Sequence, residues 1–165
     1  MSSSVTLNIA DADAMRACAL RLSSLLNGGD VLILDGPLGA GKTTFTQGLG
    51  EGLGVAGAVT SPTFVVSRIH KPGDRGVGLV HVDAYRLSGS QDLTDLEIDD
   101  RPNDVLVVEW GMPYADELGD SWLEAQISRD DHSIDDADPA SGPRTLKLVG
   151  HGPRWNDVDL NVVSA

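Results

Sequence analysis

Three short runs of apolar residues mark the predicted centre of the fold. Residues 31–34 (Val-Leu-Ile-Leu) and 105–108 (Val-Leu-Val-Val) are apolar throughout, which is typical of strands buried on both faces of a parallel sheet. Residues 79–82 (Leu-Val-His-Val) form a third run, interrupted by His81. Helical stretches lie between these runs, so the pattern predicts βαβ units with right-handed crossovers and an α/β fold.

A first helix is predicted after Asp11, because aspartate is a favourable N-cap residue. We expect Asn27-Gly28-Gly29 to end this helix. The apolar positions of the segment recur at the spacing of one helix face: Met15, Cys18, Ala19, Leu22 and Leu25 or Leu26.

A second helix is predicted after the run at 31–34, with Phe45, Leu49 and Leu53 on its apolar face. It contains three glycines, each of which costs about 0.5–1 kcal/mol relative to alanine inside a helix. We therefore expect these small residues to allow a neighbouring element to approach closely. They are Gly48, Gly50 and Gly52.

Further strands are predicted around this parallel centre. Residues 64–69 should form a hairpin with the segment around Leu79, and three other segments, 5–9, 122–128 and 145–149, read as strands. Residues 129–143 contain five aspartates, two prolines and one glycine, so we expect an acidic, solvated loop joining antiparallel strands.

The fold class predicted from these elements is a three-layer α/β fold of the P-loop NTPase type, with a parallel central sheet and added antiparallel strands. One domain should span residues 1–165, and residues 150–165 form a tail without a recognisable pattern. The length of 165 residues and the hydrophobic content of 41% agree with a single core that buries roughly 70% of the unfolded surface.

Composition adds three expectations. No apolar run reaches the roughly 18–20 residues needed to span a bilayer. Residues 1–4 lack the basic and apolar regions of a signal peptide, so we expect a cytoplasmic protein. Cys18 is the only cysteine, which excludes an internal disulfide and suggests a buried, inert thiol.

The charge of the chain is unevenly distributed. Acidic residues outnumber basic ones 25 to 12, for a net charge of -13, which argues against a whole-protein electrostatic surface for nucleic acid. Residues 1–85 contain seven acidic and six basic residues, whereas residues 86–165 contain 18 and six. An anionic ligand is therefore expected in the nearly neutral first part, held by local groups.

Residues 36–43 (Gly-Pro-Leu-Gly-Ala-Gly-Lys-Thr) match the phosphate-binding P-loop pattern G-x-x-x-x-G-K-[ST]. A buried strand precedes the pattern and a helix follows it, as this loop requires. Backbone N–H groups and the helix N-terminus would surround the phosphates, Lys42 would reach the β- and γ-phosphates, and Thr43 would ligate Mg²⁺. The expected nucleotide-binding residues of the loop are Gly36, Leu38, Gly39, Ala40, Gly41, Lys42, Thr43 and Thr44.

Two carboxylates are candidates for organising Mg²⁺ and the attacking water, because each follows a predicted strand. Glu109 follows the run at 105–108 and Asp83 follows the run at 79–82. Ligands of α/β proteins bind beside the carboxyl ends of the strands. Which of the two dominates stays open, while His81 is expected to be structural. Trp110 is expected to line the core or a pocket.

Residues 60–64 (Thr-Ser-Pro-Thr-Phe) place three hydroxyls around a proline. One interpretation is a turn whose hydroxyls cap backbone groups. The other is a switch segment in which Thr60, Ser61 and Thr63 sense the γ-phosphate or Mg²⁺. The residues themselves favour neither interpretation.

Together these motifs resemble the bacterial TsaE family, which takes part in the biosynthesis of threonylcarbamoyladenosine in tRNA. The resemblance covers about residues 5–128 and rests on four segments: G-P-L-G-A-G-K-T-T at 36–44, T-S-P-T-F at 60–64, H-V-D-A-Y-R-L at 81–87 and V-V-E-W at 107–110. It implies binding of ATP and Mg²⁺, and a weak, partner-dependent ATPase. The implied partners are TsaB and TsaD, whose transferase complex the ATPase would reset between turnovers.

The resemblance also implies residue roles. Lys42 would contact phosphates and act in catalysis, Thr43 and Glu109 would hold Mg²⁺, and Asp83 would help to position metal or water. Thr60, Ser61 and Thr63 would form the switch, and Trp110 would lie near the nucleotide. Residues 10–12 and the loop before Arg144 would flank the adenine, with Arg144 itself among the nucleotide-binding residues. The acidic loop and the tail match no family motif, and the acidic second half argues against direct tRNA binding.

Two other functions remain as alternatives. A P-loop small-molecule kinase would use the same loop, although such kinases usually need an arginine-bearing lid and basic residues are sparse in the second half. A nucleotide-gated adaptor would bind ATP without significant hydrolysis. The Asn-Lys-x-Asp sequence that a GTPase uses to read guanine does not occur in the chain.

Overall fold

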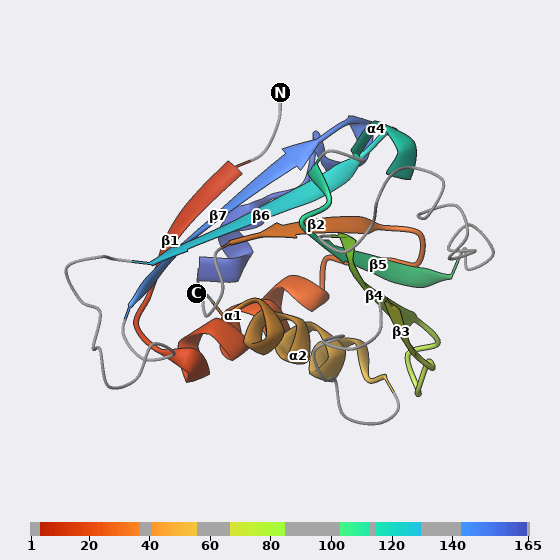
Figure 1. Ribbon diagram of the computed structural model, residues 1–165, viewed down its shortest axis with the longest axis horizontal. Helices are drawn as coiled ribbons and strands as arrows, with labels where there is room; N and C mark the ends of the chain where they lie inside the picture. The colour runs from red at the N-terminus through yellow and green to blue at the C-terminus, as the bar shows by residue number, and fades with distance from the viewer. Residues whose placement is uncertain are drawn as a thin grey trace.

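The computed structural model describes residues 4–36, 41–55, 67–84, 103–112, 115–129 and 143–164. Within them, one sheet has the strand order β1-β7-β6-β2-β5-β4-β3. Helices α1 and α2 cover one face of the sheet, and the short α4 lies on the other (Figure 1). The strands are β1 (Ser4–Ile9), β2 (Val31–Asp35), β3 (Ser67–His70), β4 (Gly78–Asp83), β5 (Asp104–Glu109), β6 (Trp122–Arg129) and β7 (Arg144–His151). The helices are α1 (Ala12–Ser23), α2 (Lys42–Leu53) and α4 (Ala115–Leu118), with 3-10 turns η5 (Pro153–Trp155) and η6 (Leu160–Ser164).

The centre of the sheet is parallel. Strand β2 pairs in parallel with β5 and β6, and β5 pairs in parallel with β4. Antiparallel strands extend the sheet on both sides of this centre: β3 pairs with β4, β7 pairs with β6, and β1 pairs with β7. The predicted α/β class, with a parallel centre and antiparallel additions, is therefore confirmed, as is the hairpin of β3 and β4. The predicted crossover between 82 and 105 falls mostly on residues 85–102, outside the described residues, as does most of the loop at 129–143.

Helix α1 begins where the sequence predicts. The side chain of Asp11 accepts a hydrogen bond of 2.8 Å from the N–H of Ala14, which satisfies one of the first-turn donors. The predicted end at residues 27–29 is wrong, since the helix ends at Ser23. The N–H groups of Leu25 and Leu26 bond to carbonyls three residues earlier, so the chain tightens into turns before it reaches the glycines.

The glycines of α2 allow it to pack closely on α1. A Cβ atom at Gly48 would overlap the backbone carbonyl of Arg16, and one at Gly52 would overlap the hydroxyl of Ser23. Gly50 is buried as well. The expectation that these small residues permit a close approach is therefore confirmed, and the neighbouring element is α1.

The main core lies between the sheet and helices α1 and α2. It contains Cys18, Phe45 and Leu49, which are all 0% exposed. Burial raises the pKa of the Cys18 thiol to about 11, in agreement with the expected inert thiol. The C-terminal segment, which showed no pattern in the sequence, also contributes buried side chains to this core through Trp155, Leu160 and Val163.

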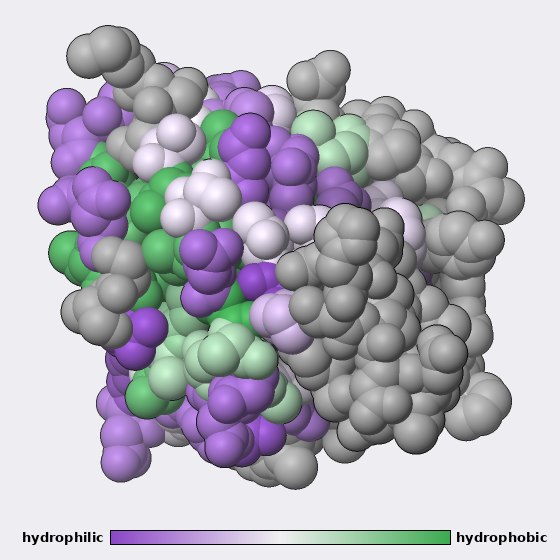
Figure 2. Space-filling view, turned by 90° about the vertical axis from the view of Figure 1, so that its left-hand side faces the viewer, coloured by the Kyte–Doolittle hydropathy of each residue, from purple (hydrophilic) through white to green (hydrophobic). Residues whose placement is uncertain are grey.

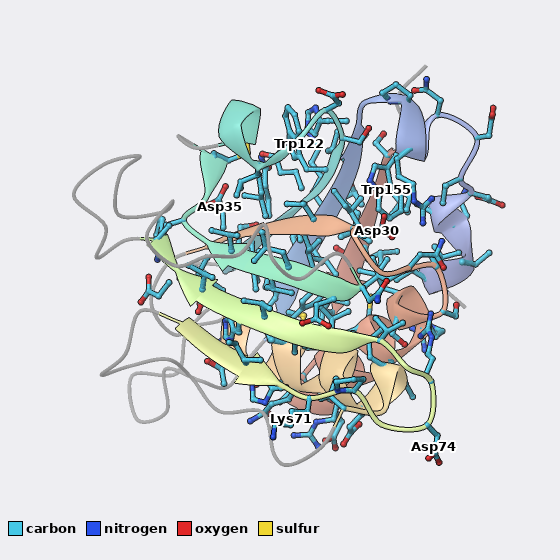
Figure 3. The ribbon with its side chains drawn as sticks, turned by 90° about the vertical axis from the view of Figure 1, so that its right-hand side faces the viewer. Asp30, Asp35, Lys71, Asp74, Trp122 and Trp155 are labelled. Atoms are coloured by element: carbon cyan, nitrogen blue, oxygen red, sulfur yellow. The ribbon has the colours of Figure 1, made fainter. Side chains whose placement is uncertain are left out.

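Arg154 links this C-terminal segment to the start of β2 through hydrogen bonds. The Nε and Nη2 atoms of Arg154 each lie 3.0 Å from one carboxylate oxygen of Asp30. Nη2 also donates to the carbonyl of Leu25 at 2.7 Å, and the guanidinium lies over the ring of Trp155. Figure 3 shows Asp30 and Trp155 together at one end of β2, with Asp35 at the other. The two ends of β2 thus have different environments.

The surface at the β1 side of the sheet mixes hydrophilic and hydrophobic side chains (Figure 2). The large apolar side chains exposed among the described residues are Leu20, Ile69 and Val162, each close to half exposed. Among the residues that the structure describes, no helix is both long and apolar enough to cross a membrane.

Candidate functional site

Three acidic residues end neighbouring parallel strands. Asp35, Asp83 and Glu109 are the last residues of β2, β4 and β5. Glu109 pairs in register with Asp83 on one side and with Leu34 on the other. The two acidic residues that the sequence offered as alternatives are therefore neighbours at one edge of the sheet. Asp35 ends the adjacent strand β2, but it follows Leu34, the residue opposite Glu109, so its side chain lies on the other face of the sheet.

Helix α2 begins beside this edge and presents an open N-terminus. Its N-cap is Gly41, whose φ of 108° is a left-handed conformation that favours glycine, and no side chain caps it. No acidic residue lies in its first turn, so the positive end of the helix dipole is not neutralised from within the helix. Thr43 and Thr44 follow Lys42 in this turn, where both are half-buried.

The side chain of Lys42 points back across the start of the loop. Its Nζ donates a hydrogen bond of 2.6 Å to the carbonyl of Gly36 and lies 4.1 Å from the centre of the Trp110 ring. Burial lowers the pKa of Lys42, while the carboxylates of Glu109, Asp83 and Asp35 oppose that effect. The ammonium group is thus partly desolvated, and the negative charges of these three carboxylates favour its charged form.

Trp110 reaches Lys42 because the backbone turns sharply after Glu109. Among the described non-glycine residues, Trp110 is the one with a positive φ, 60°, a conformation that costs on the order of 1–2 kcal/mol for such a side chain. Its N–H still donates to the carbonyl of Leu34 at 3.0 Å. The strand pairing therefore continues through the turn, and the ring lies against the lysine.

Glu109 has a buried histidine partner. The Nε2 atom of His81 lies 2.9 Å from Oε2 of Glu109, with His81 0% exposed and Glu109 6% exposed. The sequence predicted a structural histidine at this position and did not predict its contact with Glu109. The contact depends on the register of β4 and β5, which apolar patterning does not define.

A second buried carboxylate lies on the β6 side of Asp35. Glu124 accepts a hydrogen bond of 2.8 Å from Gln126 and lies 3.1 Å from Nε2 of His151. Burial raises the pKa of Asp35, Glu124 raises it further, and Lys42 opposes both effects. Sequence reasoning missed Asp35, although it follows a buried run just as Asp83 and Glu109 do, and that signal could have identified it.

Other predicted site residues fall into two groups. Leu38, Gly39, Ala40, Thr60, Ser61 and Thr63 lie outside the described residues. Arg144, the first residue of β7, is buried and pairs with Ile9, the last residue of β1. Arg144 and the turn at 10–12, both expected beside an adenine, are therefore brought together. A Cβ on Gly41 would lie 3.6 Å from Cε of Met15 in α1, so the start of α1 borders the N-terminus of α2.

The groups present suit a phosphate with an accompanying magnesium ion. The uncapped start of α2 and the Lys42 ammonium supply N–H donors of the kind that bind phosphate. The described residues include no cluster of three or more His, Cys, Asp or Glu side chains able to hold a metal. Mg²⁺ is commonly held by one or two carboxylates, waters and the phosphates themselves, so Thr43 and Glu109 offer a suitable partial donor set.

Comparison with known proteins gives consistent matches. The sequence model described as "Threonylcarbamoyl adenosine biosynthesis protein TsaE" matches residues 9–136. The TsaE protein of Streptomyces coelicolor is 49% identical over 152 residues, which cover 91% of this chain and 99% of that protein. The TsaE protein of Bacillus subtilis is 39% identical over 69% of this chain and 71% of its own length.

A solved structure agrees with these sequence matches. The crystal structure of YdiB from Bacillus subtilis superposes with a TM-score of 0.71 at 30% identity, covering 94% of this chain and 90% of that chain. The shared fold has the mixed sheet and parallel centre of a P-loop NTPase. With the family match, the near full-length relative and the common fold in agreement, this chain belongs to the TsaE family of tRNA threonylcarbamoyladenosine biosynthesis proteins.

Proposed function

We propose that this protein binds ATP and Mg²⁺ at its P-loop and hydrolyses ATP in support of tRNA threonylcarbamoyladenosine biosynthesis. The observation that carries this proposal is the position of Lys42. Its ammonium lies between the Gly36 carbonyl and the Trp110 ring, and it interacts electrostatically with the two carboxylates that end β4 and β5. A lysine, an uncapped helix start and strand-end carboxylates are the parts that phosphoryl transfer needs.

Each residue has a defined role in this proposal. Lys42 and the N–H groups at the start of α2 bind the phosphates, while Thr43 and Glu109 hold the metal. Asp83, directly beside Glu109, positions a water or a metal-bound ligand. Bound Mg²⁺ would neutralise phosphate charge and orient the terminal phosphate. Trp110 holds the lysine in place and borders the nucleotide, and Arg144 with residues 10–12 borders the adenine.

We further propose that TsaB and TsaD are its partners and that hydrolysis resets their transferase complex. Thr60, Ser61 and Thr63 would act as the switch that reports the state of the nucleotide. The second half of the chain carries 18 acidic residues against six basic ones, so the partner surface should be basic. Association through such surfaces weakens as salt increases.

The test is the rate of ATP hydrolysis by the purified chain alone and with TsaB and TsaD. We expect slow turnover alone, a clear increase with both partners, and loss of that increase between about 0.1 and 1 M salt, where the Debye length falls from about 10 to 3 Å. Partner-independent turnover with phosphorylation of a small acceptor would instead identify a kinase. ATP-dependent association without hydrolysis would identify an adaptor.

A further inference from the structure

We propose that His81 is a positioning residue for Glu109, and that its Nε2–H bond fixes the carboxylate for metal binding. This inference rests on the proposed function, because it assigns the metal-holding role to Glu109. It goes beyond that function because His81 itself would touch neither nucleotide nor metal.

The sheet register makes the contact possible. His81 pairs with Val107, and Asp83 pairs with Glu109 two residues further along. Since side chains at every second position of neighbouring strands share a face, His81 and Glu109 lie on the same face as diagonal neighbours. The imidazole spans this diagonal, and its Nε2 lies 2.9 Å from Oε2 of Glu109.

The surroundings of the ring select one tautomer. Beside an ionised Glu109, a nitrogen 2.9 Å from a carboxylate oxygen carries hydrogen, because two facing lone pairs would repel. The other ring nitrogen, Nδ1, is buried and has no hydrogen-bond partner among the described residues. If Nδ1 is unprotonated, only a hydrogen-bond acceptor is left unused. If Nδ1 carried the hydrogen, a buried donor would be left unpaired. The structure therefore favours the Nε2–H form, whose hydrogen is directed at Glu109.

The Glu109 carboxylate is repelled by one neighbouring charge and attracted by another, so a hydrogen-bond partner is needed to fix its position. Asp83, another carboxylate, ends the adjacent strand in register with Glu109, and two like charges at adjacent positions repel. Lys42 attracts Glu109, as the electrostatic effect on the lysine shows. The His81 bond uses Oε2 alone, and a carboxylate has a second oxygen with its own lone pairs. His81 can thus hold the Glu109 side chain in place while the carboxylate keeps lone pairs with which to bind a metal ion.

The variants are chosen to separate positioning from packing. In His81→Gln, the terminal amide nitrogen can take the place of Nε2 and keep the donor. In His81→Asn, the amide is too short for that position, and in His81→Leu the donor is absent while apolar bulk remains. The Gln and Asn variants are matched in polarity, so they differ chiefly in whether the hydrogen bond to Glu109 can form.

Calorimetric titration with ATP, once in EDTA and once with Mg²⁺, provides the first measurement. We expect all variants that keep a cooperative thermal unfolding transition to bind ATP in EDTA within about twofold of the unmodified protein. The gain in affinity on adding Mg²⁺ should fall about tenfold in His81→Asn and His81→Leu, as for loss of one hydrogen bond to a charged group. In His81→Gln it should recover to within about threefold. Equal Mg²⁺ gains in all variants, or no recovery in His81→Gln, would overturn the proposal.

A measurement on the unmodified protein without nucleotide distinguishes this proposal from the proposed function. Long-range ¹H–¹⁵N correlation spectra assign the tautomer of each histidine ring. We expect His81 to carry its proton on Nε2, and the signal to change in Glu109→Ala but not in Glu51→Ala, an exposed site on α2. An Nδ1–H tautomer would refute the positioning role even in an active ATPase. The expected tautomer and Mg²⁺ responses in a protein without hydrolysis would uphold the positioning role and refute the ATPase.

Discussion

The ammonium group of Lys42 lies 4.1 Å from the centre of the Trp110 indole ring. This contact joins the first residue of α2 to the residue that follows β5. A cation over an aromatic face is stabilised by about 0.5–2 kcal/mol, and more strongly where water is partly excluded. The ring therefore helps to hold the lysine where it donates to the Gly36 carbonyl.

Replacing Lys42 by alanine tests the phosphate contact. We expect ATP affinity to fall by about 10- to 150-fold, because a charge-assisted hydrogen bond of about 1.5–3 kcal/mol is lost. The measurement is calorimetric titration with ATP and Mg²⁺. Lys71→Ala removes an exposed lysine from the β3–β4 turn and serves as the matched control, with unchanged affinity expected. Equal affinities of Lys42→Ala and the unmodified protein would refute the P-loop assignment.

Trp110 should report nucleotide binding through its fluorescence. A phosphate that takes over the Lys42 ammonium changes the charge above the indole ring, so we expect the emission of the protein to change when ATP and Mg²⁺ are added. The change should disappear in Trp110→Phe. It should persist in Trp122→Phe, since Trp122 packs instead against His151 at a centroid distance of 5.0 Å. A response that follows Trp122 would place the nucleotide on the other face of the sheet.

The relative importance of the two neighbouring carboxylates can be measured with amide variants. We expect Glu109→Gln to keep its affinity for ATP in EDTA and to lose at least about a hundredfold in partner-stimulated hydrolysis, the lower range for a positioned catalytic group. Asp83→Asn should reduce the rate less, because its role is to assist. Glu51→Gln, on the exposed side of α2, controls for charge. A larger loss in Asp83→Asn would transfer the principal role to Asp83.

Asp35 should contribute a pH dependence in which the folded state becomes more stable as the pH falls. Burial and Glu124 raise its pKa in the folded state, so its ionisation opposes folding. As pH falls from 7 through the folded-state pKa, Asp35 takes up a proton in the folded chain before the unfolded chain does, and this stabilises the fold. We expect Asp35→Asn to be more stable than the unmodified protein at pH 7, with a difference that shrinks towards pH 4. Urea unfolding at several pH values checks this, and a constant difference would contradict it.

The close packing of α1 and α2 predicts a stability effect at Gly48. Alanine there would push against the backbone of Arg16, and overpacking of this kind costs about 1–3 kcal/mol. This loss should exceed the gain of about 0.5–1 kcal/mol that alanine brings to a helix. Glu51→Ala, on the same helix and exposed, should stay within about 0.5 kcal/mol of the unmodified protein. A stabilised Gly48→Ala would mean that the helices can separate without loss.

Much of the fold could be predicted because it follows from local patterns. Apolar runs that include Val31 and Val105 marked buried parallel strands, and the glycine spacing before Lys42 marked the turn into α2. The end of α1 was missed because serine hydroxyls and backbone turns end the helix before Gly28. Strong helix-breaking residues indicate where a helix cannot continue, and a helix can end earlier.

The site could be predicted in part. Asp83 and Glu109 stood out because each follows an apolar run, a feature of the sequence alone. The pairing of His81 with Glu109 joins residues 28 positions apart, and that of Arg154 with Asp30 joins residues 124 apart. Such pairs depend on register and on the path of the chain, so hydrophobic periodicity carries no signal for them.

The pairing of β1 with β7 has a consequence for how the protein folds. Ser4 lies opposite Val149, so this edge of the sheet cannot form until the chain has closed a loop that includes nearly all the residues between them. Loop closure of that length is entropically unfavourable until other contacts shorten it, and nonlocal pairing of this kind slows folding. The parallel centre around β2 should therefore assemble first, and β1 should add to it late, as the last strand to gain protection from hydrogen exchange.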